Sequence, residues 1–129
     1  MLLNIATWVS ILFVFGFALF QFLLTLGVPF GEYALGGMHK VLPAKMRLIS
    51  GFFTCFFIIV GMSYLQRAGL IKPLFSDLFT FVLLTIHTLF LAYAIIGNGF
   101  LTKSIKEKYL MTPFSIIGCI SSIYVLIGC

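Results

Sequence analysis

The sequence predicts an all-α fold, a polytopic membrane four-helix bundle with the N- and C-termini on the same, extracytoplasmic side. Of the 129 residues, 62% are hydrophobic and only 9% are charged, whereas an ordinary soluble domain is roughly 45–50% apolar. The chain contains four apolar runs, centred near Phe15, Phe57, Thr85 and Ile120. The length of each run is close to the about 20 residues that a helix needs to cross a bilayer. We therefore expect one transmembrane domain over residues 1–129, in contact with the lipid bilayer.

Residues that begin or end helices divide the chain into four expected spans, at about residues 4–28, 48–65, 76–97 and 112–129. The first stops before Pro29, because proline disfavours a helical conformation in the residue that precedes it. An arginine flanks the second span at each end. Ser76 is a good N-cap for the third span, and Asn98 with Gly99 tolerates the left-handed conformation that ends helices.

The fourth span is short, since the 17 residues from Pro113 to Cys129 reach only about 25 Å at 1.5 Å per residue. Upstream, Ser104 and Glu107 have the spacing of a capping box, which predicts a short interfacial helix. Either this helix continues through Pro113 with a kink, or Thr112 caps a separate helix and the bilayer is locally thin.

The distribution of basic residues predicts the orientation. Six follow the first and third spans and two lie on the opposite side: Lys40, Lys45, Arg47, Lys103, Lys106 and Lys108 against Arg67 and Lys72. Loops rich in lysine and arginine stay in the cytoplasm, so both termini are expected outside it. Because these residues flank spans and form no stripe interleaved with aromatic residues, no nucleic-acid partner is expected.

His87 is the most unusual residue within a predicted span, since it lies near the middle of the bilayer. At helical spacing Thr80, Leu84, Leu91 and Ala94 share its face, which we expect to point into the bundle. Three interpretations stay open: a histidine that fixes helix packing by bonding to a hydroxyl or carbonyl, a contact to a polar or transported ligand, and a proton or metal role. No metal site is predicted, because the three cysteines lack metal-ligand spacing.

Gln21 and Thr25 lie one helical turn apart on the first span, on a face that also carries Ser10. Together with His87, these side chains could line one polar recess that faces the cytoplasm. The alternative is that small polar residues only form hydrogen bonds between helices.

The loop after the first span is the richest polar segment, with Glu32, His39 and Lys40. Its glycines could bring backbone N–H groups around an anion, to which His39 and Lys40 would add positive charge. The loop matches no phosphate-binding motif, and the alternative is that glycine lets it fold back against the bundle. The candidate ligand-binding residues are therefore His87, Gln21, Thr25, Glu32, His39 and Lys40.

Three segments carry a resemblance to a known family: Gly27-Val-Pro-Phe-Gly-Glu-Tyr-Ala-Leu-Gly-Gly, Leu42-Pro43 with Arg47, and Lys106-Glu107-Lys108 with Pro113. With these segments the chain resembles, over nearly its full length, a family of small bacterial four-span integral membrane proteins of unassigned activity. The family has tryptophan where Phe30 stands and arginine where Lys108 stands. The resemblance implies a four-helix bundle in the bacterial cytoplasmic membrane, and it transfers no catalytic residues.

Three functions are compatible with these features. The first is a transporter- or channel-like protein, assembled as a homo-oligomer because four helices alone enclose little space. The second is a noncatalytic membrane partner or immunity-type protein. The third is a membrane enzyme acting on a lipid or quinone, with His39 or His87 as acid or base, but no second catalytic group is predicted. No cofactor is predicted, and the small-molecule ligand is unidentified.

Overall fold

The computed structural model describes residues 2–31, 39–101 and 105–127. These residues form four long helices and no strand: α1 (Leu2–Thr25), α2 (Ala44–Arg67), α3 (Asp77–Ile96) and α4 (Ile105–Ile127). A π-helical turn, Gly97–Leu101, follows α3. Four stretches of 21 to 24 residues are long and apolar enough to cross a membrane, and the third of them continues from α3 into the π-helical turn. The predicted all-α membrane bundle is thereby confirmed.

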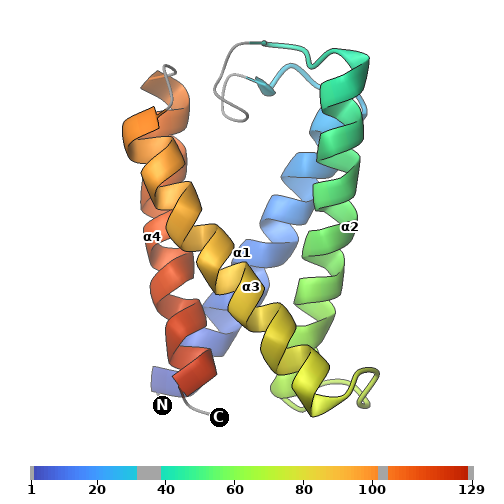
Figure 1. Ribbon diagram of the computed structural model, residues 1–129, viewed down its shortest axis with the longest axis vertical. Helices are drawn as coiled ribbons and strands as arrows, with labels where there is room; N and C mark the ends of the chain where they lie inside the picture. The colour runs from blue at the N-terminus through green and yellow to red at the C-terminus, as the bar shows by residue number, and fades with distance from the viewer. Residues whose placement is uncertain (1, 32–38, 102–104, 128–129) are drawn as a thin grey trace.

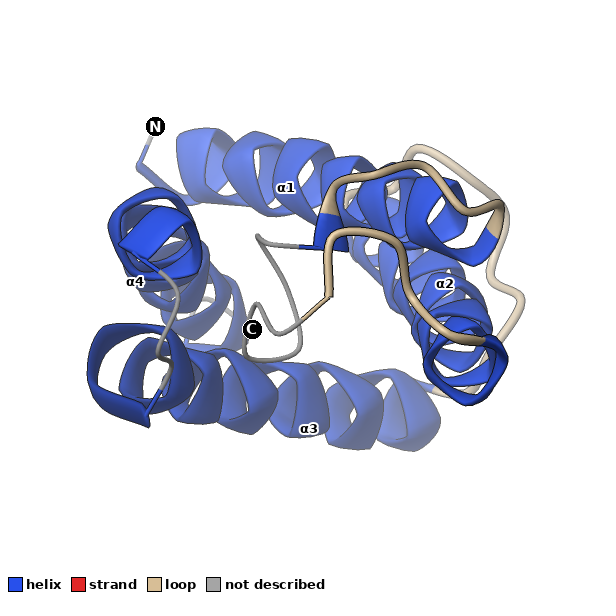
Figure 2. Cartoon of the chain, turned by 90° about the horizontal axis from the view of Figure 1, so that it is seen from above, coloured by secondary structure: helices blue, strands red, loops and turns tan. Residues whose placement is uncertain are grey.

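The four helices form a ring in chain order. α1 packs against α2 and α4, and α3 packs against α2 and α4, so that the helices outline a four-sided ring when seen from above (Figure 2). The start of α1 and the end of α4 lie at one end of the bundle, and the connections after α1 and α3 lie at the other (Figure 1). We call the latter the basic end, because most of the basic residues lie there.

Two glycines end α1 and α2 in the same way. After α1, Gly27 has a φ of 94°, and the N–H groups of Gly27 and Val28 donate to the carbonyl oxygens of Leu24 and Leu23. Gly69 has a φ of 76° and ends α2 with the equivalent pair of bonds. Glycine adopts this conformation without the clash that a Cβ atom brings. α1 therefore ends at Thr25 rather than at Val28.

The start of α3 agrees with the expected N-cap, but its end does not follow the expected signal. The Ser76 side chain accepts a hydrogen bond from the N–H of Phe79 at 3.1 Å. At the other end the chain continues into the π-helical turn, and Gly97 has a right-handed φ of −61°. Asn98 instead donates from Nδ2 to Ser115 Oγ of α4 at 3.2 Å. The left-handed helix end that was predicted at Asn98 and Gly99 is therefore not formed, and the Asn98 side chain bonds to α4.

α4 is one continuous helix that passes through Pro113, as the first of the two alternatives expects, while the kink of that alternative stays a prediction. Thr112 lies within α4 and does not cap a separate helix. Glu107 lies in the first turn and is buried, where the positive potential of a helix start favours a carboxylate. Ser104, the other half of the expected capping box, lies outside the described residues.

α2 begins at Ala44, earlier than the expected start at Leu48. The carbonyl of Pro43 accepts from the N–H groups of Met46 and Arg47, both at 3.0 Å, so the proline supplies the first turn. Lysine and arginine tolerate such a position at a span end, because their long side chains carry the charge towards the interface. The charged residues therefore mark the end of the apolar stretch and not the end of the helix.

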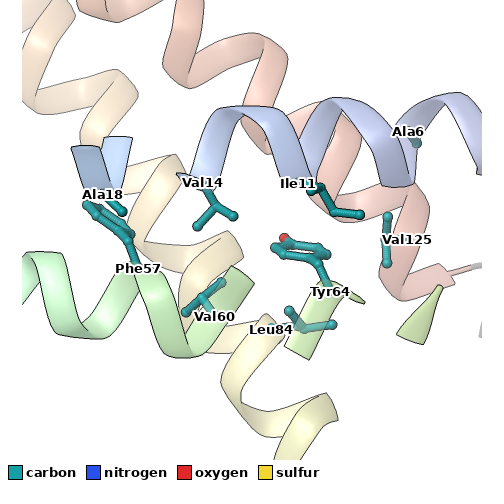
Figure 3. Close-up of a cluster of buried hydrophobic side chains, with 9 residues drawn as sticks. All are labelled: Ala6, Ile11, Val14, Ala18, Phe57, Val60, Tyr64, Leu84 and Val125. Carbon is teal, nitrogen blue, oxygen red and sulfur yellow. The ribbon is translucent and has the colours of Figure 1, made fainter. Parts of the chain in front are cut away.

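The main hydrophobic cluster of the core is built from all four helices, and buried polar side chains lie beside it. Its buried members are Ala6, Ile11, Val14, Ala18, Phe57, Val60, Tyr64, Leu84 and Val125 (Figure 3). Many large apolar side chains lie on the outside of the bundle, among them Leu12, Leu48 and Leu78, which are 67%, 77% and 74% exposed. Such a surface suits lipid and not water. The molecule is a multi-pass membrane protein by length and composition of its helices.

Candidate functional site

His87 lies in the middle of α3, on the helix face that packs into the bundle. Thr80, Leu84 and Leu91 on the same face are buried, while Ile86 on the opposite face is exposed. The predicted direction of the His87 face is therefore confirmed. Only 3% of the His87 side chain is exposed, so the imidazole depends on the protein for hydrogen bonds.

A chain of hydrogen bonds joins His87 to hydroxyl groups on three helices. Tyr64 Oη of α2 is 3.1 Å from His87 Nδ1 and 2.6 Å from Ser122 Oγ of α4. Ser122 Oγ is also hydrogen-bonded to Thr88 Oγ1. Thr88 Oγ1 donates to the carbonyl oxygen of Leu84 at 2.8 Å. The chain ties α2, α3 and α4 together in the interior, as the first interpretation of His87 predicts.

The last bond fixes the direction of all the others. The carbonyl of Leu84 can only accept, so the single hydroxyl hydrogen of Thr88 is used there. Ser122 must then donate to Thr88, and Tyr64 must donate to Ser122. It follows that His87 donates from Nδ1 to Tyr64. The imidazole is the tautomer with its hydrogen on Nδ1, and Nε2 is an acceptor that is buried without a hydrogen-bond partner.

Two hydroxyls in the same interior are also buried without a partner. Ser10 Oγ of α1 lies near the Tyr64 hydroxyl but outside hydrogen-bond geometry. Thr80 Oγ1 lies on the His87 face of α3, two turns or about 10 Å towards the helix start. Buried polar groups are nearly always paired, and the exceptions often mark a water or a ligand. We call His87, Tyr64, Ser122, Thr88 and Ser10 the His87 site.

Phenylalanine rings from α2 and α3 enclose the His87 site. The centroids of the Phe53, Phe56, Phe57 and Phe90 rings lie 5.5 to 6.3 Å from one another in five pairs. The Phe56 and Phe57 centroids are 6.5 and 6.1 Å from that of the imidazole. In such apolar surroundings each hydrogen bond is stronger, and each unpaired polar group more costly, than in water.

Gln21 and Thr25 lie near the basic end of α1. Thr25 Oγ1 donates to the carbonyl oxygen of Gln21 at 2.9 Å, while Gln21 Oε1 is buried without a partner. Val14 belongs to the same core cluster as Tyr64 (Figure 3), and Gln21 is seven residues further along α1, about 10 Å. No hydrogen bond joins Gln21 Oε1 to His87 Nε2, since both atoms are buried without a partner.

The connection after α1 contributes two exposed candidates. His39 and Lys40 are both exposed, and the carbonyl oxygen of Lys40 accepts from the N–H of Gly31 at 2.9 Å. Glu32 lies outside the described residues. Arg47 Nε donates to the carbonyl oxygen of Leu42 at 2.8 Å. The described ends of the connection are thus held by a backbone bond and by a bond from the Arg47 side chain to the backbone, and an anion site there stays a prediction.

Sequence reasoning missed Tyr64, which is central to the hydrogen-bond chain. Tyr64 lies beside the expected end of the second span at Leu65 and was assigned no role. A signal was present, since Thr54, Phe57, Val60 and Tyr64 recur at spacings of three or four residues and all are buried. Continuing this periodicity to the end of the helix identifies Tyr64 as facing inward.

No metal centre is evident in the part of the chain that the structure describes, where no three His, Cys, Asp or Glu side chains gather closely enough to hold an ion. Cys55 is exposed and Cys119 is buried. The Cys119 thiol donates weakly to the carbonyl oxygen of Thr88 at 4.0 Å, which adds one more link between α4 and α3.

The chain matches no family model, and no curated protein or solved structure is significantly similar to it. The resemblance carried by the segments after Gly27 and around Lys106 therefore stays a prediction. Function has to be argued from the geometry of the site.

Proposed function

We propose that this membrane protein is transporter-like and binds a small, uncharged polar solute at the His87 site. One observation carries the proposal: His87 Nε2 is an acceptor, buried without a partner, in the middle of a helix that can span a membrane. An unpaired buried acceptor costs about 1–3 kcal/mol. A hydroxyl, an amide or a water that donates to Nε2 recovers that cost, so the site favours such an occupant.

The groups around Nε2 favour an uncharged solute. Ser10, Tyr64, Thr88 and Ser122 offer hydroxyls, and the hydrogen-bond chain is complete with a neutral imidazole. A bound cation would need an opposite charge in this apolar interior. The chain also ends on the carbonyl of Leu84, which has no proton to pass on, so we do not propose a proton relay.

The second candidate is a noncatalytic membrane partner protein, and the aromatic packing favours it. Phe53, Phe56, Phe57 and Phe90 fill the bundle next to the His87 site, so a solute passes only if this packing rearranges. In this alternative the hydrogen-bond chain serves helix packing alone. An enzyme acting on a lipid or quinone has no observation of its own in its favour.

The proposal includes a location and an assembly. The protein resides in the cytoplasmic membrane of a bacterium, with the basic end towards the cytoplasm, and it assembles with copies of itself. The charge bias of the loops supports the orientation, and the family resemblance supports the bacterial membrane. Exposed apolar side chains on all four helices leave surface for a second copy beside the lipid.

The test uses proteoliposomes that contain the whole chain. Glycerol, urea and water permeabilities are measured by stopped-flow light scattering, with protein-free vesicles as the baseline. We expect the wild type to raise the glycerol or urea permeability several-fold. His87→Asn keeps a donor where Nδ1 stands, so the bond to Tyr64 survives, but it lacks the Nε2 acceptor. This variant should fall to the baseline while it unfolds at nearly the wild-type denaturant concentration.

His87→Gln and Thr85→Ala serve as controls. Glutamine places an amide near the Nε2 position and loses the bond to Tyr64, so it should retain part of the flux at reduced stability. Thr85 bonds only to the carbonyl of its own helix residue Phe81, and its replacement should leave the flux unchanged. Wild-type vesicles that are no more permeable than protein-free ones to all three probes would refute the transport proposal and favour the partner protein.

A further inference from the structure

An apolar groove runs between α1 and α4 on the outside of the bundle. It extends along α1 from Leu12 to Phe20 and along α4 from Leu110 to Phe114, and Phe30 closes it at the basic end. Its volume of about 470 Å³ lies within the roughly 300–1,000 Å³ of ligand sites. The lining is almost entirely aromatic and aliphatic, so the groove suits an apolar chain.

Gly16 creates the groove. It is exposed, and a Cβ atom added there would have no neighbour within 4 Å. On either side of it Phe13 and Phe17 meet Phe114 of α4 edge-on, with centroids 5.6 and 6.4 Å apart. These rings form a firm floor, because each is held by the facing helix. A larger side chain at position 16 would fill the space without disturbing the floor.

Two exposed lysines, Lys40 and Lys108, lie near the end of the groove that Phe30 closes. Gly31, next to Phe30, donates from its N–H to the carbonyl of Lys40 at 2.9 Å, which brings exposed Lys40 beside the groove. On α4, exposed Lys108 precedes Met111 of the lining by one helical turn. Lys108 Nζ lies 5.9 Å from the centroid of the Tyr109 ring. The groove is therefore apolar along its length and basic at one end.

We propose that this groove binds an anionic phospholipid of the leaflet at the basic end. One acyl chain lies along Gly16 between α1 and α4, and the phosphate group lies between Lys40 and Lys108. The charge at the end selects this occupant over a zwitterionic lipid, since lysines near a headgroup favour anionic lipids. A helix of a second copy would continue past the groove into the two lysines, whereas a lipid ends there with its charged group. The site is separate from the His87 site, and the proposal stands without the transport function.

Tryptophan fluorescence tests the proposal, because Trp8 is the single tryptophan of the chain. In a Trp8→Phe background, Phe20→Trp places a reporter in the groove, and Leu89→Trp places one on the exposed face of α3. The reporters are compared in phosphatidylcholine vesicles that contain a minor fraction of brominated phosphatidylglycerol or brominated phosphatidylcholine. For the groove reporter, we expect equal quenching at a lower concentration of brominated phosphatidylglycerol than of brominated phosphatidylcholine, by a factor of about five for each lysine that contacts the headgroup. The α3 reporter should be quenched equally by both lipids.

Two variants separate the parts of the site. Gly16→Leu should abolish the preference by filling the groove, while Leu19→Phe on the neighbouring exposed face should keep it. Lys108→Gln should lower the preference about fivefold. If Phe20→Trp does not fold, Phe114→Trp reports from the opposite wall. Equal quenching by both lipids in the groove overturns the proposal, and so does quenching that falls as protein is added, which means that a second copy covers the groove.

Discussion

The hydrogen-bond chain at His87 shows how few polar groups specify the packing of three helices. Tyr64 Oη both accepts from His87 Nδ1 and donates to Ser122 Oγ, at 3.1 and 2.6 Å. Lipid drives no association between apolar helices, so interhelical hydrogen bonds and close packing decide how they pair. Removing the middle hydroxyl therefore breaks two contacts between helices at once.

Tyr64→Phe should lower the free energy of unfolding by about 1–2 kcal/mol, because it leaves the His87 and Ser122 groups without their shared partner. A double-mutant cycle with Ser122→Ala should give a coupling energy of about 0.6–1.7 kcal/mol. Reversible unfolding in mixed micelles measures both. Tyr93→Phe is the control, since Tyr93 is 65% exposed on the same bundle and should change little. A coupling energy of zero would mean that the Tyr64–Ser122 bond contributes nothing to folding.

His87 could be predicted from the sequence and its partner could not. A histidine among leucines stands out by composition alone, and helical spacing gives the face it lies on. Tyr64 is ordinary at the end of a span, where aromatic residues gather at the interface. Tyr64 reaches inward to Ser122, 58 positions later in the chain. This contact depends on how α2 and α4 are tilted against each other. Helix spacing carries no such information.

At the level of helices, α1 and α2 approach each other closely at Gly61. A Cβ atom on Gly61 of α2 would lie 2.5 to 2.8 Å from three ring atoms of Phe15 on α1. Small residues at a helix interface let backbones and rings approach in this way. Phe15 itself packs against the core cluster, so it has little room to turn aside.

Gly61→Ala should therefore destabilise the bundle by about 1–2 kcal/mol through overpacking. Gly16→Ala is the matched control on α1. It adds the same methyl group in open space and should be neutral or stabilise by up to about 1 kcal/mol through helix propensity. Thermal denaturation of both variants in one detergent gives the comparison. Equal midpoints would show that Phe15 moves away without cost.

The ends of α1 and α3 lie within three residues of the predicted ones, but the structure does not always use the signal that the sequence suggests. Ser76 acts through its own turn and gave the correct start of α3, whereas Gly27 ends α1 at Thr25, before the expected end at Val28. Asn98 looks equally decisive in the sequence, but its side chain bonds to Ser115 of α4 and the chain continues through a π-helical turn. Pro113 lies inside α4, since membrane helices keep proline when neighbouring groups take up the freed backbone carbonyl.

At the level of the whole molecule, the fold class follows from the sequence because a bilayer allows few solutions. Backbone groups in hydrocarbon must be bonded within the segment, so four long apolar runs become four helices. Whether His87 and Gln21 line one recess could not be predicted from the depth of each residue along its own helix, because the recess also depends on how the helices are arranged. In the structure Tyr64 bonds to His87 and Thr25 bonds to Gln21, as two separate pairs. Which of them bind a ligand stays a prediction.

The orientation of the bundle is the last property to test, and charge alone argues for it. Six of the eight lysines and arginines lie in the connections after α1 and α3 or in the first turns of the helices that follow them, so the basic end should face the cytoplasm. In a chain whose native cysteines are replaced by serine, Val41→Cys probes the basic end and Leu74→Cys the opposite end. Both sites are exposed, and neither change alters a charge. A membrane-impermeant maleimide should label Leu74→Cys in intact cells and Val41→Cys only after lysis. The reverse pattern would show that the termini are cytoplasmic, and the lipid of the α1–α4 groove would then belong to the outer leaflet.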